Sequence, residues 1–207
     1  MAHQRNEALG FSDEGHYFNA HNATAGTGLA TAAAPTGDSD TKVLLVIDNP
    51  DTDKMSYLDY VSLQPTAAGG SGASIHFTHQ TDTKQRYSSG GTALTAVNVD
   101  SSDTASADCN VYAGAVTAAA AGSGKKKFGH YLMRNVIPVV GDTYRINFGG
   151  QDNPASGLAV AGTAIVNLTF NVHPVVIGPG CSWVLTLYLP SQSSASSYEF
   201  DIGWVER

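Results

Sequence analysis

Residues 181–205, CSWVLTLYLPSQSSASSYEFDIGWV, decide the fold class of this chain. Within Trp183–Leu189 and within Phe200–Trp204, every second residue is large and apolar. Alternation with a period of two is typical of a strand that buries one face, because successive side chains point to opposite sides of the sheet. The serine-rich residues between the two segments are typical of a loop. The stretch therefore predicts two strands, Ser182–Leu189 and Tyr198–Val205.

The same texture extends back to Lys42, with short β-branched and aromatic runs separated by Gly, Pro, Asn, Asp and Ser. Stretches such as Ser89–Gly91 and Gly178–Gly180 predict turns between strands. No segment shows a sustained apolar period of 3.6, so we expect little helix. This pattern predicts an all-β fold, an antiparallel two-sheet sandwich, for which jelly-roll wiring is the preferred topology. The other expected strands are Lys42–Asp48, Ser56–Gln64, Ser74–Gln80, Leu94–Val99, Asn110–Val116, Phe128–Val140, Thr143–Phe148 and Ala164–His173.

The first forty residues differ from the rest, because they are rich in Ala, Gly and Thr and show no strand-like alternation. We therefore expect an extended N-terminal arm over residues 1–40, followed by one sandwich domain over residues 41–207. Ordering a backbone costs about 1–2 kcal/mol per residue, so such an arm would be fixed only against another chain. The side chains expected to contact that partner are Leu9, Phe11, His16, Tyr17, Phe18 and Leu29.

The charge of the chain argues against nucleic acid as a partner. Its formal net charge is −7 and it holds only 11 Lys and Arg, whereas phosphate binding needs clustered cations. The basic run Lys125–Lys127 is expected to lie in a solvated loop rather than to clamp phosphate, with an acidic patch of a partner as the alternative contact. No apolar run approaches the length of a membrane span and no secretory pattern opens the chain, so we expect no membrane association.

No constellation of residues points to catalysis. Serines are plentiful, but none lies in a Gly-x-Ser-x-Gly elbow. Cys109 and Cys181 lack CxxC spacing and are expected to be free thiols. The carboxylates that a glycosidase would pair are scattered singly along the predicted strands, so we expect a protein that is not an enzyme. These carboxylates are Asp59, Asp142, Glu199 and Asp201.

We also expect no metal ion and no cofactor. His76 and His79 are three apart on one predicted strand, which places them on opposite faces and argues against a metal-binding pair. His130 and His173 are each expected to be structural. The loop at residues 48–53, DNPDTD, offers oxygen atoms but lacks the glycine and the downstream glutamate of a calcium loop.

Three passages of the chain carry a likeness to a known family. They are NATAGTGLA at 22–30 leading to APT at 34–36, GGTALTAVN at 90–98, and PGCSW at 179–183 with SASSYEF at 194–200. With them, the layout of the chain resembles small virion structural proteins of tailed bacteriophages, namely capsid decoration or cement proteins built on a jelly roll. The resemblance implies a non-enzymatic protein made in the host cytoplasm and located on the capsid exterior, where it clamps neighbouring copies of the major capsid protein. It also implies self-association, with a homotrimer favoured over a homodimer.

Two other classes of function remain open from the sequence. One is a glycan-binding sandwich of a head fibre, spike or receptor-binding protein, with aromatic rings as a stacking platform for sugars. The less favoured one is an enzyme whose site is assembled from distant loops. The candidate stacking rings are Tyr57, Tyr60, Tyr87, Tyr112, Tyr131, Tyr144 and Trp204.

Overall fold

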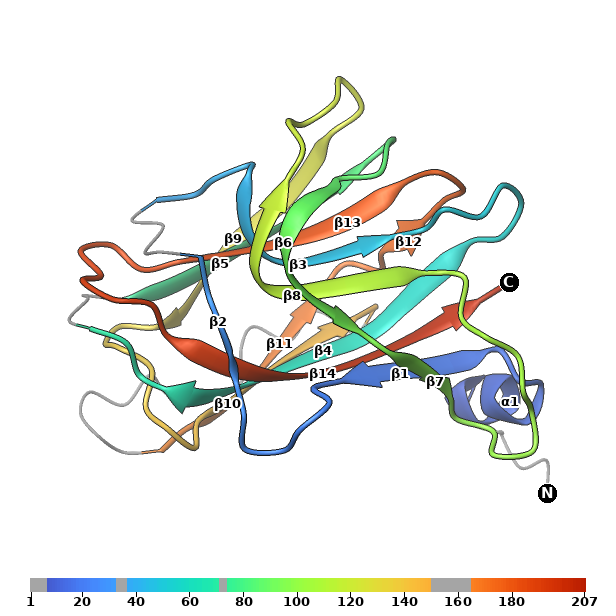
Figure 1. Cartoon of the computed structure of the whole chain (residues 1–207), viewed down its shortest axis with the longest axis horizontal. Helices are drawn as coiled ribbons and strands as arrows, with labels where there is room; N and C mark the ends of the chain where they lie inside the picture. Colours follow the sequence, from blue (N-terminus) through green and yellow to red (C-terminus); the bar gives the residue numbers. More distant parts are fainter. Residues whose placement is uncertain (1–6, 33–36, 71–73, 150–164) are drawn as a thin grey trace.

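A computed structural model describes residues 7–32, 37–70, 74–149 and 165–207, which form a sandwich of two β-sheets (Figure 1). Sheet A contains, in spatial order, β11 (Asn167–Val172), β10 (Thr143–Phe148), β4 (Ser56–Ala67), β14 (Ser197–Glu206), β1 (Tyr17–His21) and β7 (Ala96–Asn98). The short strand β12 (Val176–Ile177) pairs with β4, and β2 (Leu29–Ala30) pairs with β14. Sheet B contains β6 (Tyr87–Leu94), β8 (Asn110–Ala118), β3 (Lys42–Asp48), β13 (Ser182–Tyr188), β5 (Ile75–Asp82) and β9 (Lys126–Arg134).

The expected all-β, two-sheet sandwich is confirmed. Strand pairing is antiparallel except between β10 and β11, which run parallel. The jelly-roll wiring stays a prediction. One apolar core fills the space between the sheets, and Trp183 of β13 and Trp204 of β14, the two tryptophans of the deciding stretch, are both fully buried in it.

The expectation of an extended arm over residues 1–40 is wrong for the described part of that segment. Strand β1 lies between β14 and β7 and pairs with both. Phe18 of β1 is buried, and its ring stacks on Trp204 with ring centroids 6.1 Å apart. A five-residue strand needs only two or three apolar side chains to join the core. Because small polar residues flank β1, these few apolar residues do not produce a recognisable strand pattern in the sequence. Residues 17–30 therefore belong to the sandwich, and the described fold does not begin at residue 41.

The expected turn at Ser89–Gly91 is also wrong. These residues lie inside β6, where the register against β8 shifts and where Gly90 and Gly91 both have positive φ angles, of 71° and 66°. A Cβ atom on Gly90 would come within 2.7 Å of the Ala115 carbonyl oxygen. The glycines therefore serve a bulged edge strand and not the end of a strand.

The expected strands Leu94–Val99 and Phe128–Val140 are divided differently. Leu94 ends β6 in sheet B, and the chain crosses to sheet A to form β7. Strand β9 ends at Arg134, after which Asp142 accepts a hydrogen bond from the Val139 backbone and pairs with the buried Arg134. This buried ion pair fixes the segment between β9 and β10 as a loop. The first residue of the expected strand Ala164–His173 lies outside the described residues, and the observed strand is β11.

Candidate functional site

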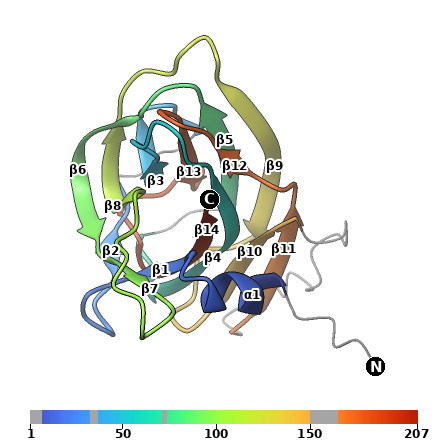
Figure 2. The same ribbon diagram turned by 90° about the vertical axis from the view of Figure 1, so that its right-hand side faces the viewer.

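One end of the sandwich brings together α1 (Glu7–Asp13), the start of β4, β12 and the C-terminus, and Figure 2 looks onto this end. We call it the terminal end. Met55, Tyr57 and Val176 are exposed there, by 44%, 39% and 44%. Tyr57 and Val176 are direct neighbours across the pairing of β4 with β12, and the Tyr57 hydroxyl lies 3.8 Å from the Met55 sulfur. The three side chains therefore form one exposed apolar group on paired strands.

Several carboxylate side chains lie on the segments of the terminal end, beside this apolar group. The cations of the same segments, Lys54 and Arg207, each pair with one carboxylate, Asp108 at 2.5 Å and Glu14 at 3.8 Å. Backbone hydrogen bonds from Lys54 and Asp53 hold the pKa of Asp51 below its usual value, so Asp51 is ionised at neutral pH. The described carboxylates of α1, of the residue that follows it, and of the loops at 49–55 and 99–109 are Asp13, Glu14, Asp51, Asp53, Asp100, Asp103 and Asp108.

Buried hydrogen bonds hold the loops of the terminal end in place. Glu206 of β14 accepts the backbone N–H groups of Asp108 and Cys109 and the indole N–H of Trp204. The backbone of Met55 exchanges two hydrogen bonds with Arg207. The terminal end is therefore a fixed surface in which both the apolar group and the acidic loops are anchored to the sheets.

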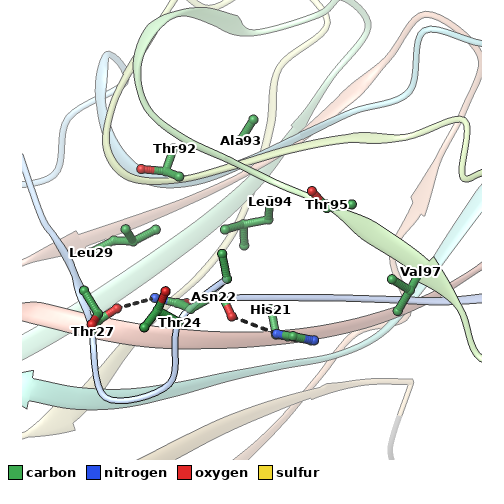
Figure 3. Close-up of a pocket in the computed structure, with 11 residues that line it drawn as sticks. His21, Asn22, Thr24, Thr27, Leu29, Thr92, Ala93, Leu94, Thr95 and Val97 are labelled. Carbon is green, nitrogen blue, oxygen red and sulfur yellow. Dashed lines mark hydrogen bonds between the residues drawn. The ribbon is translucent and has the colours of Figure 1, made fainter.

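A pocket of about 250 Å³ lies between the loop after β1 and the crossing from β6 to β7 (Figure 3). Its lining is mostly apolar and threonine-rich, and Leu29, Leu94 and Val97 contribute to it. The buried Asn22 side chain fixes the loop that lines this pocket. Its amide nitrogen donates a hydrogen bond to the Thr27 carbonyl, and its amide oxygen accepts one from the Phe200 backbone N–H. The Asn22 side chain thus fixes the loop through both its nitrogen and its oxygen.

A second pocket, of about 290 Å³, opens on the outer face of sheet A beside the same loop. Polar side chains dominate it. Glu199 accepts a hydrogen bond from the Gly26 backbone, and Asp201 accepts hydrogen bonds from Asn19 and from the Tyr60 hydroxyl. The side chains that line it are His21, Asn22, Ala25, Ser62, Gln64, Glu199, Phe200 and Asp201. We call this surface the polar pocket.

The residues expected to contact a partner do not lie together on one surface. Phe18 is buried in the chain's own core, and Tyr17 is buried by the chain as well, with its hydroxyl donating to Asp59 at 2.6 Å. Leu29 is partly buried against the core and lines the apolar pocket. Phe11 and His16 remain near the surface at the terminal end, where the Arg207 guanidinium lies 4.3 Å from the Phe11 ring centre and His16 is exposed. Leu9 lies in α1, and its side chain is outside the described part.

Most of the rings considered for sugar stacking are covered. Trp204 and Tyr144 are fully buried, while Tyr131 stacks on Phe77. Tyr87 and Tyr112 cover each other, with ring centroids 3.6 Å apart, and the Arg145 guanidinium lies 3.9 Å from the Tyr60 ring centre. Among these candidate rings, Tyr57 is the exposed one, and it lies at the terminal end.

The basic run at residues 125–127 pairs with this chain's own carboxylates. Lys125 lies 2.6 Å from Asp40, and Lys127 pairs with Asp38. Asp38 also accepts a hydrogen bond from Thr78 of β5, so the segment crosses the outer face of sheet B. The expectation of a solvated loop is wrong for Lys126 and Lys127, which begin β9, and the positive charge of the run is partly neutralised by Asp38 and Asp40.

Sequence reasoning missed the terminal end because its parts are far apart in the chain. Exposed apolar residues carry no signal of their own, since single ones are common on protein surfaces.

Within the described ranges, no group of three His, Cys, Asp or Glu side chains is placed to hold a metal ion, and no helix is long and apolar enough to cross a membrane. Comparison of the chain with protein-family models, with curated proteins and with solved structures finds no match to any of them.

Proposed function

We propose that this protein is a non-enzymatic structural protein of a virus particle, which decorates the outside of the capsid shell and cements it by bridging neighbouring copies of the major capsid protein. The observation that carries the proposal is the terminal end, where an exposed apolar group on paired strands is accompanied by anchored acidic loops. The resemblance of the sequence to decoration proteins indicates that the partner is the major capsid protein. The contact surface is the sandwich itself and not an N-terminal arm, because β1 is a strand of sheet A.

The chemistry of the terminal end defines the surface that it fits. Burying Met55, Tyr57 and Val176 against a partner would contribute roughly 1.5–3 kcal/mol for each side chain that becomes fully buried. The acidic loops would attract a basic rim on the partner and repel an acidic one, which favours correct orientation and fast association more than raw affinity. The expected partner surface is therefore an apolar patch with lysine or arginine around it.

Self-association would strengthen such a contact. We expect a homotrimer rather than a homodimer, in line with the resemblance. Several terminal ends in one oligomer would engage several capsid proteins together, and the high effective concentration of each additional contact would slow release from the shell. The protein would be made in the host cytoplasm and would then be located on the capsid exterior.

The test is binding to shells of the major capsid protein that lack this chain. The double variant Tyr57→Lys, Val176→Lys removes two apolar contacts and adds charge of the sign expected on the partner. We expect its affinity to fall at least about 100-fold, since losing two such contacts costs several kcal/mol and each 1.4 kcal/mol is a factor of ten. Binding of the unchanged protein should weaken as salt is raised.

A matched control places the same charges elsewhere. Val140 and Ile165 are exposed by 55% and 63%, and Val140 lies close to the end of β4 opposite to Tyr57, because Gly141 donates to the Pro65 carbonyl. The variant Val140→Lys, Ile165→Lys should bind shells as the unchanged protein does. Equal binding by the two double variants would contradict docking through the terminal end.

The polar pocket favours glycan binding as a second candidate function. It groups two carboxylates, two amides and an imidazole on one sheet face, which are the donors and acceptors that bind sugar hydroxyls. Against it, Glu199 and Asp201 already hold the loop after β1 and the neighbouring strands. Retention of one sugar class on a glycan array, together with unchanged behaviour of shells that lack the protein, would favour this candidate over cementing.

A further inference from the structure

Three side chains meet on the outer face of sheet B, away from the terminal end. His76 lies on β5, His130 on the neighbouring strand β9, and Tyr188 on β13, directly opposite His76 in the pairing of β13 with β5. Nδ1 of His76 is 3.2 Å from Nε2 of His130, and the Tyr188 hydroxyl is 2.8 Å from the same His130 nitrogen. The His76 ring also stacks on the Tyr188 ring, at 5.2 Å between centroids.

A bulge in β9 brings His130 to this face. Phe128 pairs with His79 and Tyr131 pairs with Phe77, so two residues of β9 lie opposite one residue of β5. The first of the two is Gly129, whose φ angle of 60° lies in the left-handed region that favours glycine. An inserted residue of this kind redirects the following side chain. His130 consequently points to the outer face while its neighbours on both sides keep their inward register.

The second nitrogen of His76 is held by a hydrogen bond. Ser74 Oγ lies 2.6 Å from Nε2 of His76. When the serine oxygen accepts a hydrogen bond from Nε2–H, the proton of the neutral ring stays on Nε2, and the lone pair of Nδ1 is available to bind a metal ion. Outer-shell hydrogen bonds orient metal-binding histidines in the same way.

We propose that Nδ1 of His76 and Nε2 of His130 bind a divalent transition-metal ion, with zinc as the expected ion. Two imidazole nitrogens at about 2.0–2.1 Å from a tetrahedral zinc ion lie about 3.3 Å apart. The observed separation is 3.2 Å, so a metal ion fits between the rings with little movement of either strand. His130 is exposed, which gives the ion a path from solvent. When the ion binds, Nε2 of His130 exchanges its contact with the Tyr188 hydroxyl for the ion, and water completes the coordination.

Calorimetric titration of the full chain with zinc tests the site, on protein purified without a polyhistidine tag. Each of the variants His76→Asn and His130→Asn should bind zinc at least about tenfold more weakly, because each removes one of two protein ligands. Ser74→Ala, which removes the outer-shell hydrogen bond, should weaken binding by about tenfold. His173→Asn, at an exposed histidine outside the pair, should bind zinc as the unchanged chain does.

Copper supplies a spectroscopic count of the ligands. In a His3→Ala background, which removes the copper site that an amino terminus forms with a histidine at position 3, the electron paramagnetic resonance spectrum with one equivalent of Cu²⁺ should show two coordinating nitrogens when both His76 and His130 are present and one in His130→Asn. Zinc binding of equal affinity in the unchanged chain and in His130→Asn would overturn the proposal, and so would a copper spectrum without nitrogen ligands. These outcomes are independent of docking to a capsid.

Discussion

Replacing Phe18 with alanine is expected to lower the free energy of unfolding of the isolated protein by about 3–5 kcal/mol. Phe18 is only 3% exposed, and its ring packs on Trp204 within the core. The loss combines the transfer free energy of the ring with the cavity that remains, because well-packed neighbours relax only in part. Urea unfolding of the two proteins, followed by tryptophan fluorescence, measures the difference.

The same variant distinguishes a strand from an arm. If residues 1–40 were an arm ordered only by a partner, Phe18→Ala would leave the isolated chain as stable as before and would weaken only partner binding. Phe11→Ala serves as the control, since Phe11 is half-buried under Arg207 outside the main core. Its expected cost is smaller than that of Phe18→Ala. Equal stability of Phe18→Ala and the unchanged chain would show that β1 does not contribute to the fold.

Lowering the pH from 7 to about 4 is expected to remove up to about 3 kcal/mol of stability through His79. Burial, followed by the charge of His173, lowers the pKa of His79 from its usual value of 6.5 to about 4. Its ring is 1% exposed and accepts the indole N–H of Trp183. Between these two pKa values the unfolded chain binds a proton that the folded chain does not, so stability falls as the pH falls through this window.

The variant His79→Gln checks this assignment, because glutamine retains a hydrogen-bond acceptor for Trp183 but does not titrate. Between pH 7 and 4, its free energy of unfolding should change less than that of the unchanged chain by up to about 3 kcal/mol. The difference between the two curves is the measure, since burial raises the pKa of Asp48 and therefore acts with the opposite sign in the lower part of the window. Parallel curves would exclude His79 as the source. His16→Gln, at an exposed histidine that does not shift the pKa of His79, is the matched control.

The sequence predicted most strands well because alternation reports directly which face is buried. Lys42–Asp48 and Thr143–Phe148 have the predicted bounds, since both combine β-branched and aromatic residues with clear ends. Strand β6 escaped prediction because its exposed face and paired glycines resemble a turn. Strand β1 was not predicted because its few apolar residues lie in a segment of small polar residues.

The candidate sites could not be derived in the same way, because each depends on contacts between distant segments. Tyr57 and Val176 become neighbours only through the pairing of β4 with β12. His76 was excluded from a metal pair on its spacing to His79, and that argument holds for those two residues. Its neighbour is instead His130, which one inserted residue at Gly129 turns to the same face. Cross-strand register and bulges have no local sequence signal strong enough to predict them.

Hydrogen exchange of the isolated, full-length chain is the most direct test of the central claim, which is that residues 17–21 form a strand of the sandwich without any partner. Strand β1 is bonded on both sides, to β14 and to β7. Its amides should therefore exchange as slowly as those of β14, with protection that approaches the global free energy of unfolding. Exchange of these amides within seconds, while β14 stays protected, would contradict the claim and restore an arm that needs another chain to order it.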